Sequence, residues 1–150
     1  MPALLIKDVR IFDGENEIPR GSVLVENGLI KQVSKEQLSV SDSSTTIVSK
    51  PGHTLIPGIV DGHAHAHIDE ENTVLRQALK FGVTTLCDMH QETENVPILR
   101  AQAARDPDSA DFKTCSVAAT ILGGWPVAVV TAHDKSEEVR GVLNPDTSSS

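Results

Sequence analysis

Three histidines alternate with alanines over residues 63–67, directly after the short apolar pair Ile59-Val60. In a β-strand, residues i and i+2 point to the same face, about 6.6 Å apart along the backbone. Imidazoles placed in this way at His63 and His65 can both reach one divalent ion, to which imidazole nitrogens bind at about 2.0–2.1 Å. In a helix the same two residues would not face each other. The spacing therefore predicts a metal site, provided that the segment is a strand.

The residues before the histidines favour a strand. Pro57-Gly58 is a turn signal, and the β-branched pair Ile59-Val60 follows it. We expect a buried strand over 59–62 whose carboxyl end opens into the site, as in parallel α/β proteins. The alternatives for such histidines are a solvated loop or a hydrogen-bonded core position. Because imidazole is the commonest metal ligand, we predict that His63 and His65 bind a divalent metal, with zinc as the expected ion.

The first part of the chain has the pattern of short strands. We expect strands within residues 4–12, 23–33 and 47–56, and a polar loop over residues 39–46. Asn27-Gly28 lies between two apolar runs, and this dipeptide is the strongest short signal for a β-hairpin. The sequence therefore predicts a small β-sheet unit in this part of the chain.

From Pro57 the pattern changes to strands that alternate with helices, which is typical of parallel α/β structure. We expect strands over 59–62, 83–88 and 114–119, and helices over about 71–80 and 96–105. Two later segments complete the interpretation. Residues 127–130 fit either a strand or a loop, and the polar residues 144–150 are expected to be disordered.

Three segments, in this order along the chain, resemble the metal-dependent amidohydrolase superfamily, in particular its imidazolonepropionase-, prolidase- and dihydroorotase-like members. Residues 5–14 and 21–30 are similar to the opening strands of the small β-sandwich of that family. Residues 55–65 are similar to the Asp-x-His-x-His signature that ends the first strand of its (β/α)8 barrel. Residues 82–88 are similar to its second barrel strand.

The resemblance implies a fold and an activity. Residues 1–56 would form part of a β-sandwich, and residues 57–143 about three β/α units of an incomplete TIM-like barrel, since a complete one takes about 250 residues. The family hydrolyses carbon–nitrogen bonds in small amides or cyclic amides, and His63 and His65 would bind its more buried metal. The other family ligands are a carbamylated lysine, two further histidines and an aspartate that is also the base. No segment here matches them, so we expect a truncated chain that is inactive by itself.

Two hypotheses follow for the function. The chain is the N-terminal portion of a metal-dependent amidohydrolase, or it is an inactive amidohydrolase-like fragment with a structural or interaction role. A third pattern, the cupin barrel, also binds metal through His-x-His, but it requires an antiparallel strand through Glu70. Instead, Val74, Leu75, Ala78 and Leu79 form one stripe of a helix, which disfavours the cupin fold.

Four other residues are candidates for a place near the metal or the substrate. Asp61 would either orient an imidazole or serve strand-end hydrogen bonding. His67 would either meet substrate or lie in a solvated loop. His90 follows a predicted strand and could face the barrel mouth, although a polar loop position is favoured. Trp125 is in a loop that often shapes the substrate pocket of the family, and packing explains it equally well.

Charge and cysteine content limit the partners. Asp and Glu (21) exceed Lys and Arg (13), giving a formal charge of −8, which disfavours nucleic acid and anionic lipid as partners. Cys87 and Cys115 do not form a Cys-x-x-Cys pair, and no apolar run has the length of a signal peptide. We therefore expect free thiols and a cytoplasmic location. A barrel that stops after three strands would expose an apolar sheet edge, so self-association is also expected.

Overall fold

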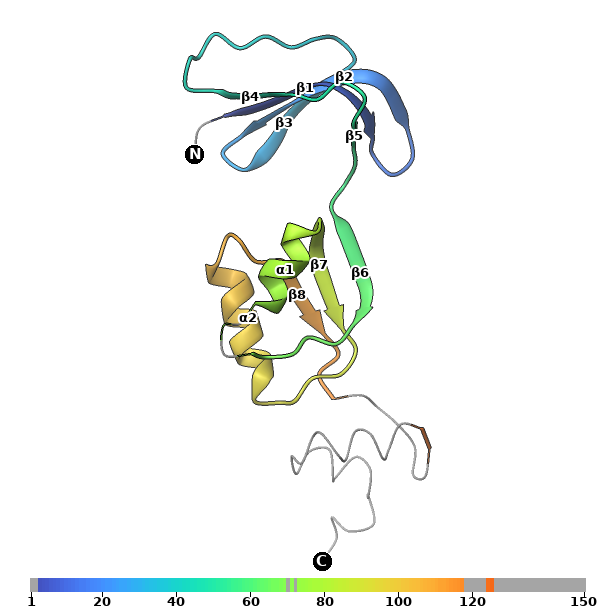
Figure 1. The fold of residues 1–150 in the computed structure, drawn as a ribbon, viewed down its shortest axis with the longest axis vertical. Coiled ribbons are helices and arrows are strands. Elements are labelled where there is room, and N and C mark those ends of the chain that lie inside the picture. Colours follow the sequence, from blue (N-terminus) through green and yellow to red (C-terminus); the bar gives the residue numbers. More distant parts are fainter. Residues whose placement is uncertain (1–2, 70, 72, 118–123, 126–150) are drawn as a thin grey trace, which may run out of the picture. The chain divides into compact units, whose positions relative to one another are not determined.

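The computed structural model describes residues 3–69, 71, 73–117 and 124–125, and the chain divides into two units, Met1–Pro57 and Gly58–Ser150. The predictions for residues 127–130 and 144–150 lie outside the described residues. The first unit contains five strands (Figure 1): β1 (Leu4–Phe12), β2 (Glu17–Glu26), β3 (Leu29–Ser34), β4 (Thr46–Ser49) and β5 (Thr54–Leu55).

Strand β1 is the centre of a single mixed sheet in the first unit. It pairs antiparallel with β2 and parallel with both β4 and β5, and β3 pairs with the other edge of β2. The buried residues Val9, Ile11 and Val23 form the core of this unit. The described residues of this unit form one sheet, so the predicted β-sandwich is not confirmed.

The hairpin between β2 and β3 turns at Asn27-Gly28, as the sequence predicted. Asn27 has φ 53° and Gly28 has φ 79°. A two-residue hairpin of type I′ needs positive φ at both positions, and asparagine followed by glycine adopts that conformation at the lowest cost. The turn therefore sets the register in which Val25 faces Ile30, and an irregularity between Leu24 and Val25 shifts the pairing by one residue beyond that point.

The second unit alternates strands and helices. Its elements are β6 (Ile59–Ala64), α1 (Val74–Lys80), β7 (Val83–Asp88), α2 (Asn95–Arg105) and β8 (Asp111–Thr114). The three strands are all parallel and lie in the order β6-β7-β8. Parallel pairing confirms the predicted α/β pattern and excludes the antiparallel cupin alternative for these residues. In Figure 1 the helices lie beside the three-stranded sheet.

Two predicted boundaries in the second unit were wrong, and so was the burial expected for the strand over 59–62, since Ile59 is 47% and Val60 61% exposed. The third strand is at Asp111–Thr114, whereas the prediction placed it over 114–119, of which 118 and 119 lie outside the described residues. It pairs with β7 only as far as Thr114, which lies opposite the last residue of β7, and Ser116 has φ 61°, which interrupts an extended chain. Helix α1 begins at Val74 rather than near residue 71, because the Asp69 carboxylate accepts hydrogen bonds from the backbone amide and the hydroxyl of Thr73.

One apolar cluster holds the second unit together. Leu75 of α1 and Leu99 of α2 are fully buried against Leu86 of β7 and Phe112 of β8, and Leu86 lies opposite Phe112 in the sheet. Both helices therefore cover the same face of the sheet. Burying one such side chain contributes about 1.5–3 kcal/mol. Ala66, which follows the strand of the histidines, belongs to the same cluster and anchors that segment to the core.

Candidate metal centre

The carboxyl end of β6 presents His63, and His65 follows one residue after the strand ends. The prediction that one regular strand carries both residues was wrong in this detail. Between Asp61 and Ala64 the strand holds one more residue than its partner β7 does between Leu86 and Asp88. Such a bulge redirects the side chains near it. A regular alternation of faces therefore does not extend from Asp61 to His65.

The two imidazoles nevertheless lie side by side. Their ring centroids are 5.6 Å apart and the ring planes are inclined by 79°. An imidazole nitrogen lies about 1.2 Å from its ring centre, so two rings that bind one ion at about 2.0–2.1 Å, at a tetrahedral angle, have centres about 5.2 Å apart. The observed separation is close to this value, and with the 79° inclination it is also that of an edge-to-face contact between the rings. Both side chains are also exposed, so their nitrogens are accessible to an ion.

Two imidazoles form only part of a metal site. Among residues 3–69, 71, 73–117 and 124–125, no group of three or more His, Cys, Asp or Glu side chains is placed to hold a metal ion. A catalytic zinc ion has three protein ligands and an open position. The described residues therefore fit a divalent metal as two of its ligands and do not complete its coordination.

Asp61 binds the backbone rather than an imidazole ring. One oxygen of its carboxylate accepts a hydrogen bond from the backbone amide of His63 at 3.1 Å. This is the strand-end role that the sequence left open, and it fixes the peptide that carries the first histidine of the pair.

The other three candidate residues lie in different surroundings. His67 is exposed, like the two histidines before it. His90 is half-buried, its Nε2 atom is buried, and its backbone amide donates to Asp88 at 2.9 Å. It lies in the loop after β7, as favoured from the sequence, but it is partly buried there. Trp125 is 84% exposed, so the described structure does not show it forming a pocket wall.

Sequence reasoning missed two polar residues that organise this segment. Asp88, at the end of β7, is fully buried, and Gln91 is 4% exposed. Both side chains bind the backbone of Ala66, between His65 and His67. A signal was present in the sequence, because Asp88 ends a strand predicted to be parallel to that of the histidines, and parallel strands bring their carboxyl ends together.

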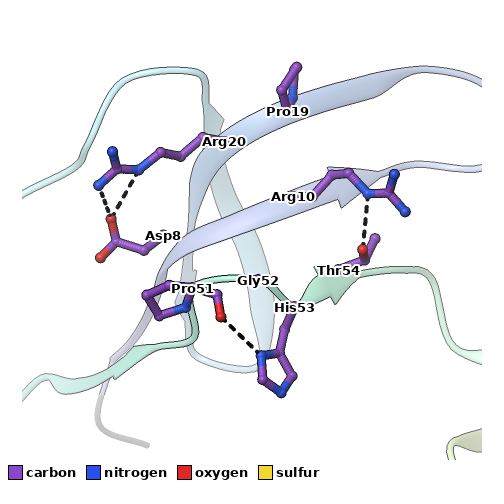
Figure 2. A pocket seen from close by; sticks show the side chains of 8 residues that line it. All are labelled: Asp8, Arg10, Pro19, Arg20, Pro51, Gly52, His53 and Thr54. Carbon is purple, nitrogen blue, oxygen red and sulfur yellow. Dashed lines mark hydrogen bonds and ion pairs between the residues drawn. The ribbon is translucent and has the colours of Figure 1, made fainter.

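A groove in the first unit is lined by charged side chains, and Figure 2 shows how they are paired. The Arg20 guanidinium binds the Asp8 carboxylate at 2.6 Å, and Arg10 donates to the Thr54 hydroxyl at 3.0 Å. His53 lies 3.3 Å from the carbonyl oxygen of Pro51. These side chains bind groups of the same sheet surface. The groove is therefore a weaker candidate for chemistry than the two histidines, His63 and His65.

Comparison with known proteins gives similar sequences and similar folds. No family model matches the chain. The chain is 34% identical over 92 residues to a dihydroorotase of Elusimicrobium minutum (strain Pei191), covering 57% of this chain and 21% of the relative. It is 30% identical over 96 residues to an enamidase of Eubacterium barkeri, covering 57% of this chain and 25% of the relative. The chain thus matches about a fifth to a quarter of the length of these two relatives.

Solved structures share the fold at lower identity. A Xaa-Pro dipeptidase with bound methionine matches with a TM-score of 0.65 and 16% identity, over 79% of this chain and 34% of that chain. Phenylurea hydrolase B matches with a TM-score of 0.65 and 21% identity, over 95% of this chain and 37% of that chain. A dihydroorotase structure matches with a TM-score of 0.53 and 21% identity, over 76% of this chain and 30% of that chain. None of the described helices has the length and apolar character needed to cross a bilayer.

Proposed function

Because the chain belongs to the amidohydrolase superfamily and matches its N-terminal region, we propose that it serves metal-dependent hydrolysis of carbon–nitrogen bonds in small amides or cyclic amides. The relatives named dihydroorotase and enamidase support this substrate class. The substrate, the number of metal ions and their identity are part of the proposal, with zinc as the expected ion.

The observation that carries the proposal is the pair of imidazoles at the end of a parallel strand. His63 and His65 would hold the ion through one nitrogen each, and their ring separation of 5.6 Å is close to the value expected for two imidazoles that share one ion. A bound divalent metal would lower the pKa of a water molecule towards neutrality and polarise a substrate carbonyl. The carboxylate of Asp61 accepts a hydrogen bond from the backbone amide of His63 and so restrains the peptide that carries the first imidazole.

A second candidate function has its own support. The described residues bring together two imidazoles and no group of three or more His, Cys, Asp or Glu side chains that could hold a metal ion, whereas a catalytic zinc site uses three protein ligands. The alternative is therefore an amidohydrolase-like chain that binds metal weakly and has a structural or interaction role. Self-association through the exposed apolar residues Ile59 and Val60 of β6 would suit that role, and it stays a prediction, as does the cytoplasmic location.

Zinc titration of the full 150-residue chain separates the two functions. We expect the wild type to bind zinc, and His63→Ala and His65→Ala each to lose most of that affinity. His53→Ala, which removes a histidine of the other unit, is the matched control and keeps the wild-type affinity. Hydrolysis of dihydroorotate is measured on the same four proteins.

The outcomes are distinct. Zinc-dependent hydrolysis that disappears in both His63→Ala and His65→Ala supports the amidohydrolase function. Zinc binding without hydrolysis of dihydroorotate favours the structural alternative. The proposed metal-binding role of His63 and His65 would be contradicted if the wild type binds no zinc. It would also be contradicted if the variants at these positions bind zinc as well as the wild type does.

A further inference from the structure

The peptide of Ala66 is held on both of its hydrogen-bonding sides by buried side chains. The Asp88 carboxylate accepts a hydrogen bond from the Ala66 amide at 2.7 Å, and the Gln91 side-chain amide donates to the Ala66 carbonyl at 2.6 Å. The same Gln91 nitrogen lies 3.2 Å from Asp88 Oδ2. The two side chains therefore close a ring of hydrogen bonds around one residue.

Asp88 suits this place because a carboxylate accepts on both oxygens. Its Oδ2 atom receives Ala66 N–H and Gln91 Nε2, and its Oδ1 atom receives the His90 amide at 2.9 Å and the Thr114 hydroxyl at 3.5 Å. All four partners are donors. An ionised carboxylate accepts hydrogen bonds at both oxygen atoms. An amide side chain of the same shape would place its NH2 group, which is a donor, against two of these four donors.

The backbone on either side of His65 is bound at three points to the last residue of β7 and to the loop that follows it. Ala64 lies opposite Asp88 in the sheet, and the Met89 amide donates to the Ala64 carbonyl at 3.0 Å. The other two points are the hydrogen bonds of Ala66 with the side chains of Asp88 and Gln91. Because Ala66 is also buried in the apolar core, the peptides on either side of His65 cannot rotate without breaking hydrogen bonds or exposing apolar surface.

We propose that Asp88 and Gln91 are positioning residues for the two candidate metal ligands, His63 and His65. They hold the backbone of His65 so that its imidazole stays beside that of His63. The effect on metal affinity rests on the proposed function, whereas the effect on the geometry of the two rings does not. A fixed backbone lowers the conformational entropy that the ligands lose when an ion binds. Groups that orient metal ligands commonly change metal affinity by about 10–100-fold when they are replaced.

The test replaces Asp88 by asparagine, which keeps the size of the side chain and removes one acceptor. Three quantities are measured in the full chain: zinc affinity by titration, the nuclear Overhauser effect between the His63 and His65 rings, and hydrogen exchange of the Ala66 amide. We expect Asp88→Asn to weaken zinc binding about 10–100-fold, to weaken the ring-to-ring signal and to speed exchange at Ala66.

Two further variants separate positioning from general loss of stability. Leu99→Ala destabilises the same core without touching a hydrogen bond of Ala66, and it should keep the ring-to-ring signal of the folded protein. If Asp88→Asn does not fold, Gln91→Met decides, since it keeps the length of the side chain and removes the donor to the Ala66 carbonyl. We expect it to change all three quantities in the same direction.

The readouts also distinguish this proposal from the proposed function. A folded Asp88→Asn or Gln91→Met variant with wild-type ring contact and wild-type exchange at Ala66 would overturn the positioning role, whatever its zinc affinity. A wild type that binds no zinc, combined with loss of ring contact in the variants, would leave positioning supported and the metal function refuted.

Discussion

Replacing Leu99 by alanine should cost the second unit about 3 kcal/mol of unfolding free energy. Leu99 is 0% exposed and packs in the cluster that contains Leu75, Leu86 and Phe112. Removing three buried carbons costs about 2.4 kcal/mol at about 0.8 kcal/mol each. The cavity that remains adds to this cost, and buried Leu→Ala changes fall between about 2.7 and 5.0 kcal/mol, with the higher costs where the surroundings relax least.

The adjacent residue provides a matched control. Ile98 lies on the same helix and is 46% exposed, so its truncation removes about half as much buried surface. Alanine is also the better helix former by a few tenths of a kcal/mol. We expect Ile98→Ala to cost about 1 kcal/mol or less. The difference between the two variants is then about 2 kcal/mol, which is roughly 30-fold in the folding equilibrium.

Urea unfolding followed by far-ultraviolet circular dichroism measures this difference, since the helices of the described structure belong to the second unit. The dependence on urea should keep its slope while the midpoint falls in proportion to the lost stability. Equal midpoints for the two variants would refute the conclusion that one apolar cluster on one face of the sheet holds this unit together.

Two further predictions concern close packing and pH. Gly58→Ala should destabilise the protein by about 1–3 kcal/mol, because a β-carbon there would lie 2.7 Å from the Thr84 β-carbon, whereas Gly62→Ala meets no atom within 4 Å and should be near neutral in the same urea experiment. A hydrogen bond from Arg76 lowers the pKa of Asp106 below its usual value, with smaller contributions from two neighbouring groups, so this carboxylate stabilises the fold above about pH 4 and loses that effect as pH falls through its lowered pKa. The stability gap between wild type and Asp106→Asn should therefore narrow as pH falls below about 4, and a gap that stays constant with pH would contradict the assigned ion pair.

Much of the fold could be predicted because its patterns are local. The apolar run over 83–88 is strand β7, and the stripe that includes Leu75 is helix α1. The hairpin at Asn27-Gly28 followed from the backbone conformations that these two residues adopt easily. In each case the chemical character of a few neighbouring residues decides the structure, so local sequence patterns were sufficient.

The arrangement of the site depended on contacts that periodicity does not encode. The extra residue in β6 arises from pairing with β7, so the sequence around Asp61 gave no sign of it. Strand β6 ends at Ala64 because side chains of Asp88 and Gln91 then replace the strand ladder as partners of the next peptide. These residues are more than twenty positions away along the chain. The nearness of His63 and His65 was predicted correctly, but for a regular strand that the structure does not contain.

The bulge in β6 has a consequence for comparing this chain with related sequences. It absorbs one residue between Asp61 and Ala64 without breaking the pairing on either side. A homologue that lacks the position of Gly62 could keep every backbone pair between these two strands. Its first histidine would nevertheless point to the opposite face of the sheet, since one step along a strand reverses the face. Insertions and deletions of a single amino acid at this point would thus leave the architecture intact while separating the two nitrogen ligands.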